Sequence, residues 1–71
     1  MKYTRTDNEE GTTLAIEGTL DAVTAPDLRS VVDAIVNESR KEVTLELSSL
    51  RLIDSSGVGV IVSLFKRVRA L

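Results

Sequence analysis

Two residue types with special chemistry are missing from this chain, which contains no cysteine and no histidine. Without cysteine the chain can form neither disulfides nor thiolate metal sites. Without histidine it lacks the commonest general base and the commonest metal ligand. We therefore expect that the protein is not an enzyme and that it has no catalytic residue, no metal and no cofactor.

Long apolar runs are also missing. The longest, from Val58 to Phe65, is interrupted by Gly59 and Ser63 and is far shorter than the ~20 residues of a membrane span. The first five residues, 1–5, lack the apolar run of a signal peptide. These features predict a cytoplasmic protein with no membrane span.

A strong charge of either sign is absent too, because 9 basic and 11 acidic residues leave a net charge of −2. Nucleic-acid binding calls for a clustered basic face. The nearest approach is Lys66, Arg67 and Arg69, which fall in the last turns of a predicted helix, where cations complement the helix dipole. We expect no nucleic-acid partner.

A length of 71 residues allows one small domain, 1–71. Residues 2–6 and 12–17 alternate as strands do, and the polar segment 7–11 between them predicts an antiparallel hairpin. Residues 18–21 are expected to leave the second strand.

A first helix has a clear start signal. Thr24 is a predicted N-cap, Asp27 lies three residues later, and Pro26 falls in the first turn. An apolar stripe at helical spacing follows: Leu28, Val31, Val32, Ile35 and Val36.

Residues 42–47 form the third predicted strand, parallel to the second because a helix connects them. After a connection over 48–53, a second helix is expected from about residue 57 to the end. Its main apolar stripe is predicted to comprise Val58, Ile61, Val62, Phe65 and Val68, widened by Val60, Leu64 and Leu71. So wide a stripe needs a second cover, either a missing C-terminal segment or a second copy of the chain in a homodimer. The predicted fold is α/β, a small mixed β-sheet with helices on one side in the order β-β-α-β-α.

The segment Asp54-Ser55-Ser56-Gly57 places an acid and two hydroxyls at the start of that second helix. One interpretation is simple N-capping, which is worth about 0.5–2 kcal/mol. A single cap needs only one such residue, however, and three stand in a row.

Together with Gly18-Thr19-Leu20-Asp21 after the second strand, the segment 54–59 resembles the STAS family, found in anti-sigma factor antagonists and sulfate transporter tails. The resemblance covers essentially all 71 residues. Members of the family usually continue into another strand and helix that are absent here, so the domain is expected to be C-terminally truncated.

The resemblance implies an anti-sigma factor antagonist that works by partner switching and so regulates transcription in a bacterium. Ser56 would be phosphorylated by an anti-sigma factor with serine kinase activity, with Ser55 as the second candidate, and a serine phosphatase would reverse the modification. The unmodified protein would bind the anti-sigma factor and the phosphoprotein would be released. The implied partner-binding residues are Asp21, Asp54, Ser55, Ser56, Gly57, Val58 and Gly59.

Two other classes of function compete with this one. Catalysis by Ser55 or Ser56 would need an activating base, and the segment is not the Gly-x-Ser-x-Gly pattern of a nucleophile elbow. A STAS module without a kinase cycle is the stronger rival: a stressosome scaffold, a transporter-associated domain or a subunit of a lipid-transport complex.

Overall fold

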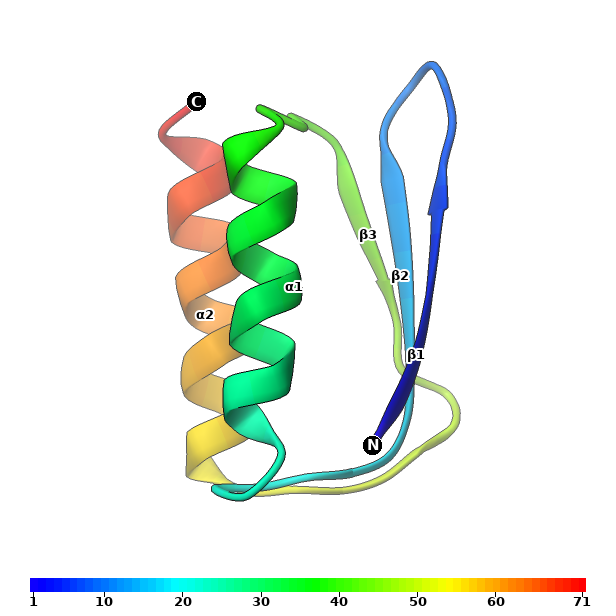
Figure 1. Ribbon diagram of the computed structural model, residues 1–71, viewed down its shortest axis with the longest axis vertical. Helices are drawn as coiled ribbons and strands as arrows, with labels where there is room; N and C mark the ends of the chain where they lie inside the picture. The colour runs from blue at the N-terminus through cyan, green and yellow to red at the C-terminus, as the bar shows by residue number, and fades with distance from the viewer.

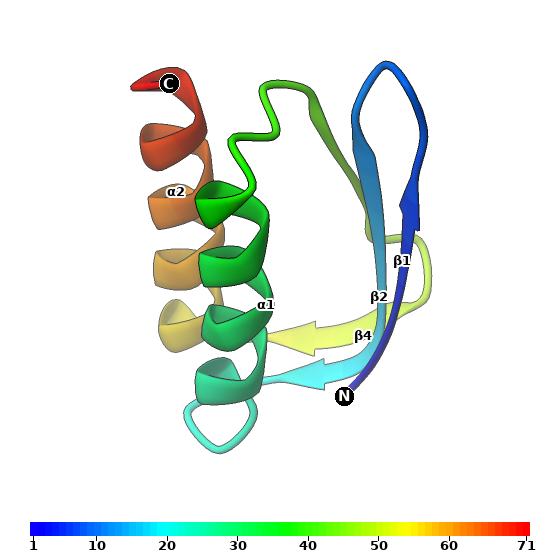
Figure 2. The ribbon, with the colours of Figure 1, turned by 45° about the horizontal axis from the view of Figure 1, so that its top comes forward.

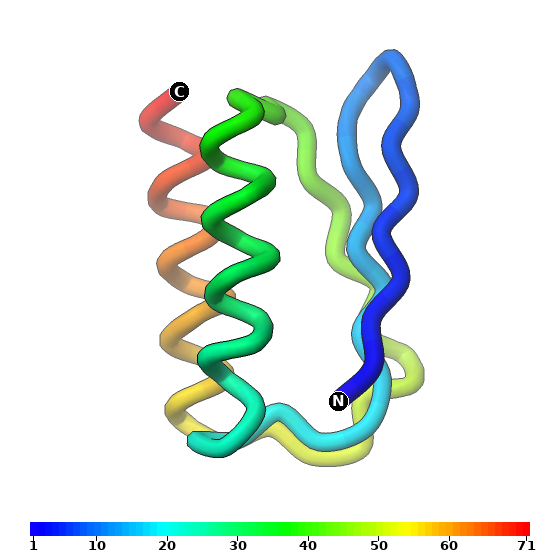
Figure 3. The backbone as a smooth tube through the Cα atoms, in the orientation of Figure 1, coloured from blue at the N-terminus to red at the C-terminus, as the bar shows by residue number.

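The central element of the molecule is strand β2, which pairs with all three other strands. In the computed structural model, which describes residues 1–71, β1 pairs antiparallel with β2, while β3 and β4 both pair parallel with it. Both helices lie side by side on one face of the sheet (Figures 1 and 3). The elements are β1 (Lys2–Asp7), β2 (Thr12–Leu20), α1 (Ala25–Asn37), β3 (Val43–Glu46), β4 (Leu50–Ile53) and α2 (Ser55–Arg69).

The predicted α/β class, the hairpin and the parallel pairing of β2 with β3 are confirmed. The hairpin loop is held by its own side chain, because the Asn8 Oδ1 atom accepts from the backbone N–H groups of Glu10 (2.9 Å) and Gly11 (2.8 Å). This is the local bond that favours asparagine in turns.

The prediction that the chain leaves the sheet at Gly18 is wrong. Strand β2 runs on to Leu20, and Gly18–Leu20 pairs with β4, a strand that was expected to be a connection (Figure 2). The register shifts between Gly18 and Thr19, and Gly18 has φ +92°, a conformation that glycine adopts without strain. The element order is therefore β-β-α-β-β-α.

The core lies between the helices and the sheet. Alternate residues of β2 and the predicted stripe of α1 meet there, so the amphipathic patterns of these two elements are confirmed. The ten buried hydrophobic residues are Leu14, Ile16, Leu20, Ala25, Leu28, Val31, Val32, Ile35, Val60 and Leu64.

The predicted main stripe of α2 is only partly buried. Ile61 and Val68 pack against the core, whereas 43–47 % of Val58, Val62 and Phe65 remains exposed. Val60 and Leu64, which were expected only to widen the stripe, are 2 % and 1 % exposed. Helix α2 also begins at Ser55, two residues before the expected start.

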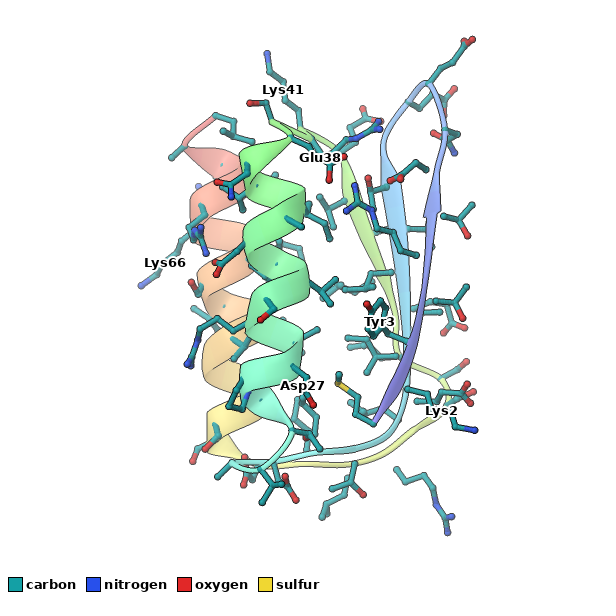
Figure 4. All side chains as sticks on the ribbon, viewed as in Figure 1. Lys2, Tyr3, Asp27, Glu38, Lys41 and Lys66 are labelled. Carbon is teal, nitrogen blue, oxygen red and sulfur yellow. The ribbon has the colours of Figure 1, made fainter.

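A few polar contacts fasten the edges of the domain. The Thr12 hydroxyl donates to Asp7 Oδ1 (2.6 Å) and Arg5 pairs with the same carboxylate, and both contacts lower the pKa of Asp7. Arg5 also bonds Glu38 beyond the end of α1 (labelled in Figure 4), the main reason that its own pKa is raised. Such exposed pairs contribute little free energy, so burial in the core remains the main stabilising term.

Candidate functional site

The candidate site forms where β2 and β4 end side by side. Leu20 pairs with Ile53 in the parallel register, and the backbone N–H of Asp54 donates to the Leu20 carbonyl (3.1 Å). The next residue of each strand, Asp21 and Asp54, therefore lies at the same end of the sheet. This juxtaposition places the loop before α1 beside the first turn of α2.

Asp54 is the N-cap of α2. It is extended (φ −109°, ψ −174°), and its Oδ1 atom accepts from the backbone N–H groups of Ser56 (2.8 Å) and Gly57 (3.3 Å). A carboxylate at this position also interacts favourably with the helix dipole. The cap is thus supplied by Asp54, which leaves the hydroxyl of exposed Ser55 and that of partly buried Ser56 free of this task.

Asp21 closes the neighbouring loop. Its Oδ1 atom accepts from the backbone N–H groups of Val23 (2.9 Å) and Thr24 (3.1 Å), which is an Asx turn. Thr24 occupies the N-cap position of α1 but makes no capping bond, contrary to the prediction, because its hydroxyl oxygen accepts from the Asp21 N–H (2.9 Å) while its proton is donated to the Thr19 carbonyl (3.0 Å). The loop is therefore tied to β2 and presents Val23, which is 83 % exposed.

The two glycines of the segment have different surroundings. A Cβ atom on Gly57 would lie 2.6 Å from Leu20 Cγ and 2.9 Å from Ile53 Cγ1, so Gly57 allows the helix to dock closely on the strand ends. A Cβ atom on Gly59 would meet nothing within 4 Å. Close helix–sheet packing therefore depends on Gly57 and not on Gly59.

Hydrophobic side chains are left exposed near this end of the sheet. Val58, one turn into α2, is 47 % exposed, Leu52 in β4 is 59 % exposed, and Val23 projects from the loop. Val58 was among the expected partner-binding residues, whereas Val23 and Leu52 were not. Two features of the sequence could have indicated these exposed side chains. Val23 is a single valine within a polar turn, and Leu52 is a leucine in a segment that was expected to be a connection.

The site is a surface rather than a cavity. The hollows in the molecular surface lie elsewhere, and the largest, about 550 Å³, is lined only by polar residues and glycine at the hairpin loop and the end of α1. No group of three or more acidic side chains is placed to hold a metal ion. A hydroxyl-bearing helix start with exposed apolar neighbours suits contact with another protein.

Neither helix has both the length and the apolar character that crossing a membrane would require.

These features define a small α/β domain in which the start of α2 carries two serines and lies beside the loop that contains Asp21. The family model described as the STAS domain matches residues 2–71. The chain therefore belongs to the STAS domain family, as the resemblance of its two motifs predicted.

Solved structures share this fold over almost the whole chain. An anti-sigma factor antagonist from Mycobacterium paratuberculosis has a TM-score of 0.85 at 23% identity, with 92% of this chain and 56% of that chain covered. The anti-sigma factor antagonist SpoIIAA in its unphosphorylated form has a TM-score of 0.81 at 18% identity, with 97% and 64% covered. SpoIIAA in its phosphorylated form, described as a Bacillus cell fate determinant, gives 0.80 at 18%, with the same coverage. This chain thus spans 56–64% of the length of these proteins.

Substitutions at Asp54 separate capping from charge. We expect Asp54→Ala to lower the free energy of unfolding by about 0.5–2 kcal/mol, because the N–H groups of Ser56 and Gly57 lose their acceptor. Asp54→Asn keeps a capping oxygen and should stay close to wild type, since asparagine caps as well as aspartate. Urea unfolding of the three proteins measures both effects, and an equal loss in both variants would contradict the capping role.

Proposed function

We propose that this chain is a non-enzymatic anti-sigma factor antagonist that binds an anti-sigma factor with serine kinase activity and is released when Ser56 is phosphorylated. The observation that carries the proposal is the capped helix start, in which Asp54 supplies the cap and two serine hydroxyls are left over beside the Asp21 loop. The membership of the STAS family and the fold shared with antagonists support it. The proposed setting is the cytoplasm of a bacterium, where a serine phosphatase would restore the unmodified form.

The proposed docking surface combines the two neighbouring loops with the first turns of α2. We include exposed Val58 and Val23 as its apolar part, and Gly59 would leave room for close approach of the partner. Its polar part comprises Asp54 and the two hydroxyls. Asp21 belongs to the proposed surface as well, because it binds backbone N–H groups through its Oδ1 atom alone, as Asp54 does.

Phosphorylation would act on this surface through charge. A phosphate adds about −1.5 to −2 charges at pH 7. At Ser56 the helix dipole favours an anion, so the folded domain should tolerate the modification. The Asp54 carboxylate caps the same helix start, so a docked partner would have to desolvate two neighbouring negative groups. Release follows from that cost. The existence of SpoIIAA in both an unphosphorylated and a phosphorylated form is consistent with such a cycle.

A phosphorylation assay tests the proposal directly. The chain is incubated with a candidate anti-sigma factor kinase and ATP, and intact mass is recorded for wild type, Ser56→Ala and Ser55→Ala. We expect one phosphate on the wild type and on Ser55→Ala, and none on Ser56→Ala. Circular dichroism of the three proteins controls for loss of structure.

The possible failures have different meanings. A phosphate retained by Ser56→Ala and lost in Ser55→Ala would move the modification to Ser55, which is the more exposed of the two. Binding of the partner without phosphate on any protein would contradict the kinase cycle and favour a STAS scaffold instead.

A further inference from the structure

We propose that Thr24 is a positioning residue of the candidate site, whose hydroxyl holds the Asp21 loop (residues 21–24) against β2 in the arrangement that the partner binds. The inference rests on the proposed docking function and deepens it, because it names the side chain on which one half of the docking surface depends. Thr24 is partly buried, whereas Ala22 and Val23 of the same loop are exposed. Its role is therefore exerted through its neighbours.

Two consecutive carbonyl groups of β2 hold the two halves of the site, which lie at the same end of the sheet (Figure 2). The Leu20 carbonyl accepts from the backbone N–H of Asp54 (3.1 Å) and so fastens the start of α2. The Thr19 carbonyl accepts from the Thr24 hydroxyl (3.0 Å) and so fastens the loop before α1. The first link is made by the backbone and the second by one side chain. A substitution at Thr24 therefore frees the loop without removing the link to α2.

The same hydroxyl also orders the inside of the loop. Its oxygen accepts from the backbone N–H of Asp21 (2.9 Å), and Asp21 Oδ1 accepts in return from the N–H of Thr24 (3.1 Å). The Asp21 Oδ1 atom lies farther from the Thr24 hydroxyl (3.3 Å) than the Thr19 carbonyl does, which directs the hydroxyl proton to the sheet. The loop is thus closed on itself by Asp21 and placed on the sheet by Thr24.

This use of Thr24 replaces a helix cap. A threonine at an N-cap position ordinarily accepts from an N–H group of the first turn and stabilises its helix. Thr24 has that position in α1, but its backbone is helical (φ −94°, ψ −18°) and its side chain makes no capping bond. Natural proteins break such local rules mainly at functional sites. The hydroxyl that α1 does not use is the one that places the loop carrying Asp21.

A loop that is ordered before binding loses less conformational entropy when the partner docks. The loop presents Asp21 and the exposed side chain of Val23 to the proposed partner. Without the Thr24 hydroxyl, the partner would have to order this loop at the moment of binding, and that ordering lowers affinity. We expect a loss of about tenfold, comparable to the cost of fixing one backbone residue.

Thr24→Val tests this role, because valine has nearly the shape of threonine but no hydroxyl. The rate of phosphorylation by the candidate anti-sigma factor kinase is measured as a function of the concentration of this chain. We expect Thr24→Val to raise KM about tenfold and to leave kcat unchanged, since the substitution weakens docking but leaves Ser56 as it is. Thr24→Ser keeps the hydroxyl and should restore the wild-type KM.

Thr12→Val is the matched control. The Thr12 hydroxyl also makes a bond within the domain, to Asp7 Oδ1 (2.6 Å), but Thr12 lies at the other end of β2. This variant loses a comparable hydrogen bond and should keep the wild-type KM. An equal rise in KM in both variants, or no rescue by Thr24→Ser, would show that Thr24 only stabilises the fold and would overturn the proposal.

Amide hydrogen exchange tests the loop without a partner. The Asp21 N–H should be protected in the unmodified chain, because the Thr24 hydroxyl is its acceptor, and should exchange faster in Thr24→Val. Free exchange of this N–H in the unmodified chain would contradict the positioning role even if Thr24→Val failed to fold.

The two hypotheses fail in different ways. An unmodified chain that the kinase neither binds nor phosphorylates, with the Asp21 N–H protected, would contradict the proposed function and leave the loop placed as described. Phosphorylation of Thr24→Val with the wild-type KM would contradict the positioning role alone.

Discussion

Replacing Leu64 by alanine should lower the free energy of unfolding by about 2–5 kcal/mol, the usual cost of truncating a buried leucine. Leu64 is 1 % exposed and belongs to the core between α2 and the rest of the domain. A domain of 71 residues has only about 4–11 kcal/mol of stability in total, at roughly 0.05–0.15 kcal/mol per residue. Leu64→Ala should therefore leave a protein that is partly unfolded at 25 °C or melts well below the wild type.

Val62→Ala is the matched comparison for this prediction. Val62 lies two residues away in the same helix, but 43 % of it is exposed. Alanine also has the better helix propensity, so the expected change is within about 0.5 kcal/mol. Urea unfolding followed by circular dichroism at dilute protein concentration measures both variants without the contribution of association. Equal losses at positions 62 and 64 would show that the buried face of α2 has been assigned incorrectly.

Gly57→Ala and Gly59→Ala should change the free energy of unfolding in opposite directions, although both glycines lie near the start of α2. Gly57→Ala places a methyl group 2.6 Å from Leu20 Cγ and 2.9 Å from Ile53 Cγ1. Leu20 is fully buried and cannot move aside freely, so we expect a net loss of about 1–3 kcal/mol from overpacking. Because Gly57 docks the helix start on the strand ends, the change should also disturb the segment that presents Ser56.

Gly59→Ala should instead stabilise the domain by about 0.5–1 kcal/mol. Its new methyl group meets nothing within 4 Å, and alanine removes the entropic cost of glycine in a helix. Thermal unfolding of the two variants beside the wild type provides the measurement, again at dilute protein. Stabilisation by Gly57→Ala would contradict the close packing of α2 on Leu20.

The fold explains why the start of α2 is sensitive to substitution. The ends of β2 and β4 meet there: the Asp54 N–H donates to the Leu20 carbonyl, and Gly57 packs closely on Leu20. The neighbouring loop is held by the bond from the Val23 N–H to Asp21. Ser56, the proposed phosphorylation site, lies next to Gly57 at this closely packed end of the domain. That rigidity is what a docking surface needs if one added charge is to decide between binding and release.

Much of the architecture follows from the sequence through local rules. Alternation in β2 and the i, i+3, i+4 spacing in α1 each gather the apolar residues on a single face of the element. Because that face is the one to be buried, the sequence determined which residues of β2 and α1 face the core. The polar loop containing Asn8 and Gly11 determined the hairpin, and the segment beginning at Asp54 determined where the candidate site lies.

The tertiary structure alone decided the remaining features. Strand β4 is four residues long and exists because it pairs with Gly18–Leu20, a contact between segments about thirty residues apart that no local pattern contains. The Thr24 hydroxyl accepts from the Asp21 N–H and donates to the Thr19 carbonyl in β2, and these two bonds replace the expected cap. In α2 apolar residues occupy most of the circumference, so periodicity could not single out a face. Only the close docking of Gly57 on Leu20 turned Val60 and Leu64 inward and left Val62 and Phe65 outside, because a helix approaches a strand most closely where it has no side chain.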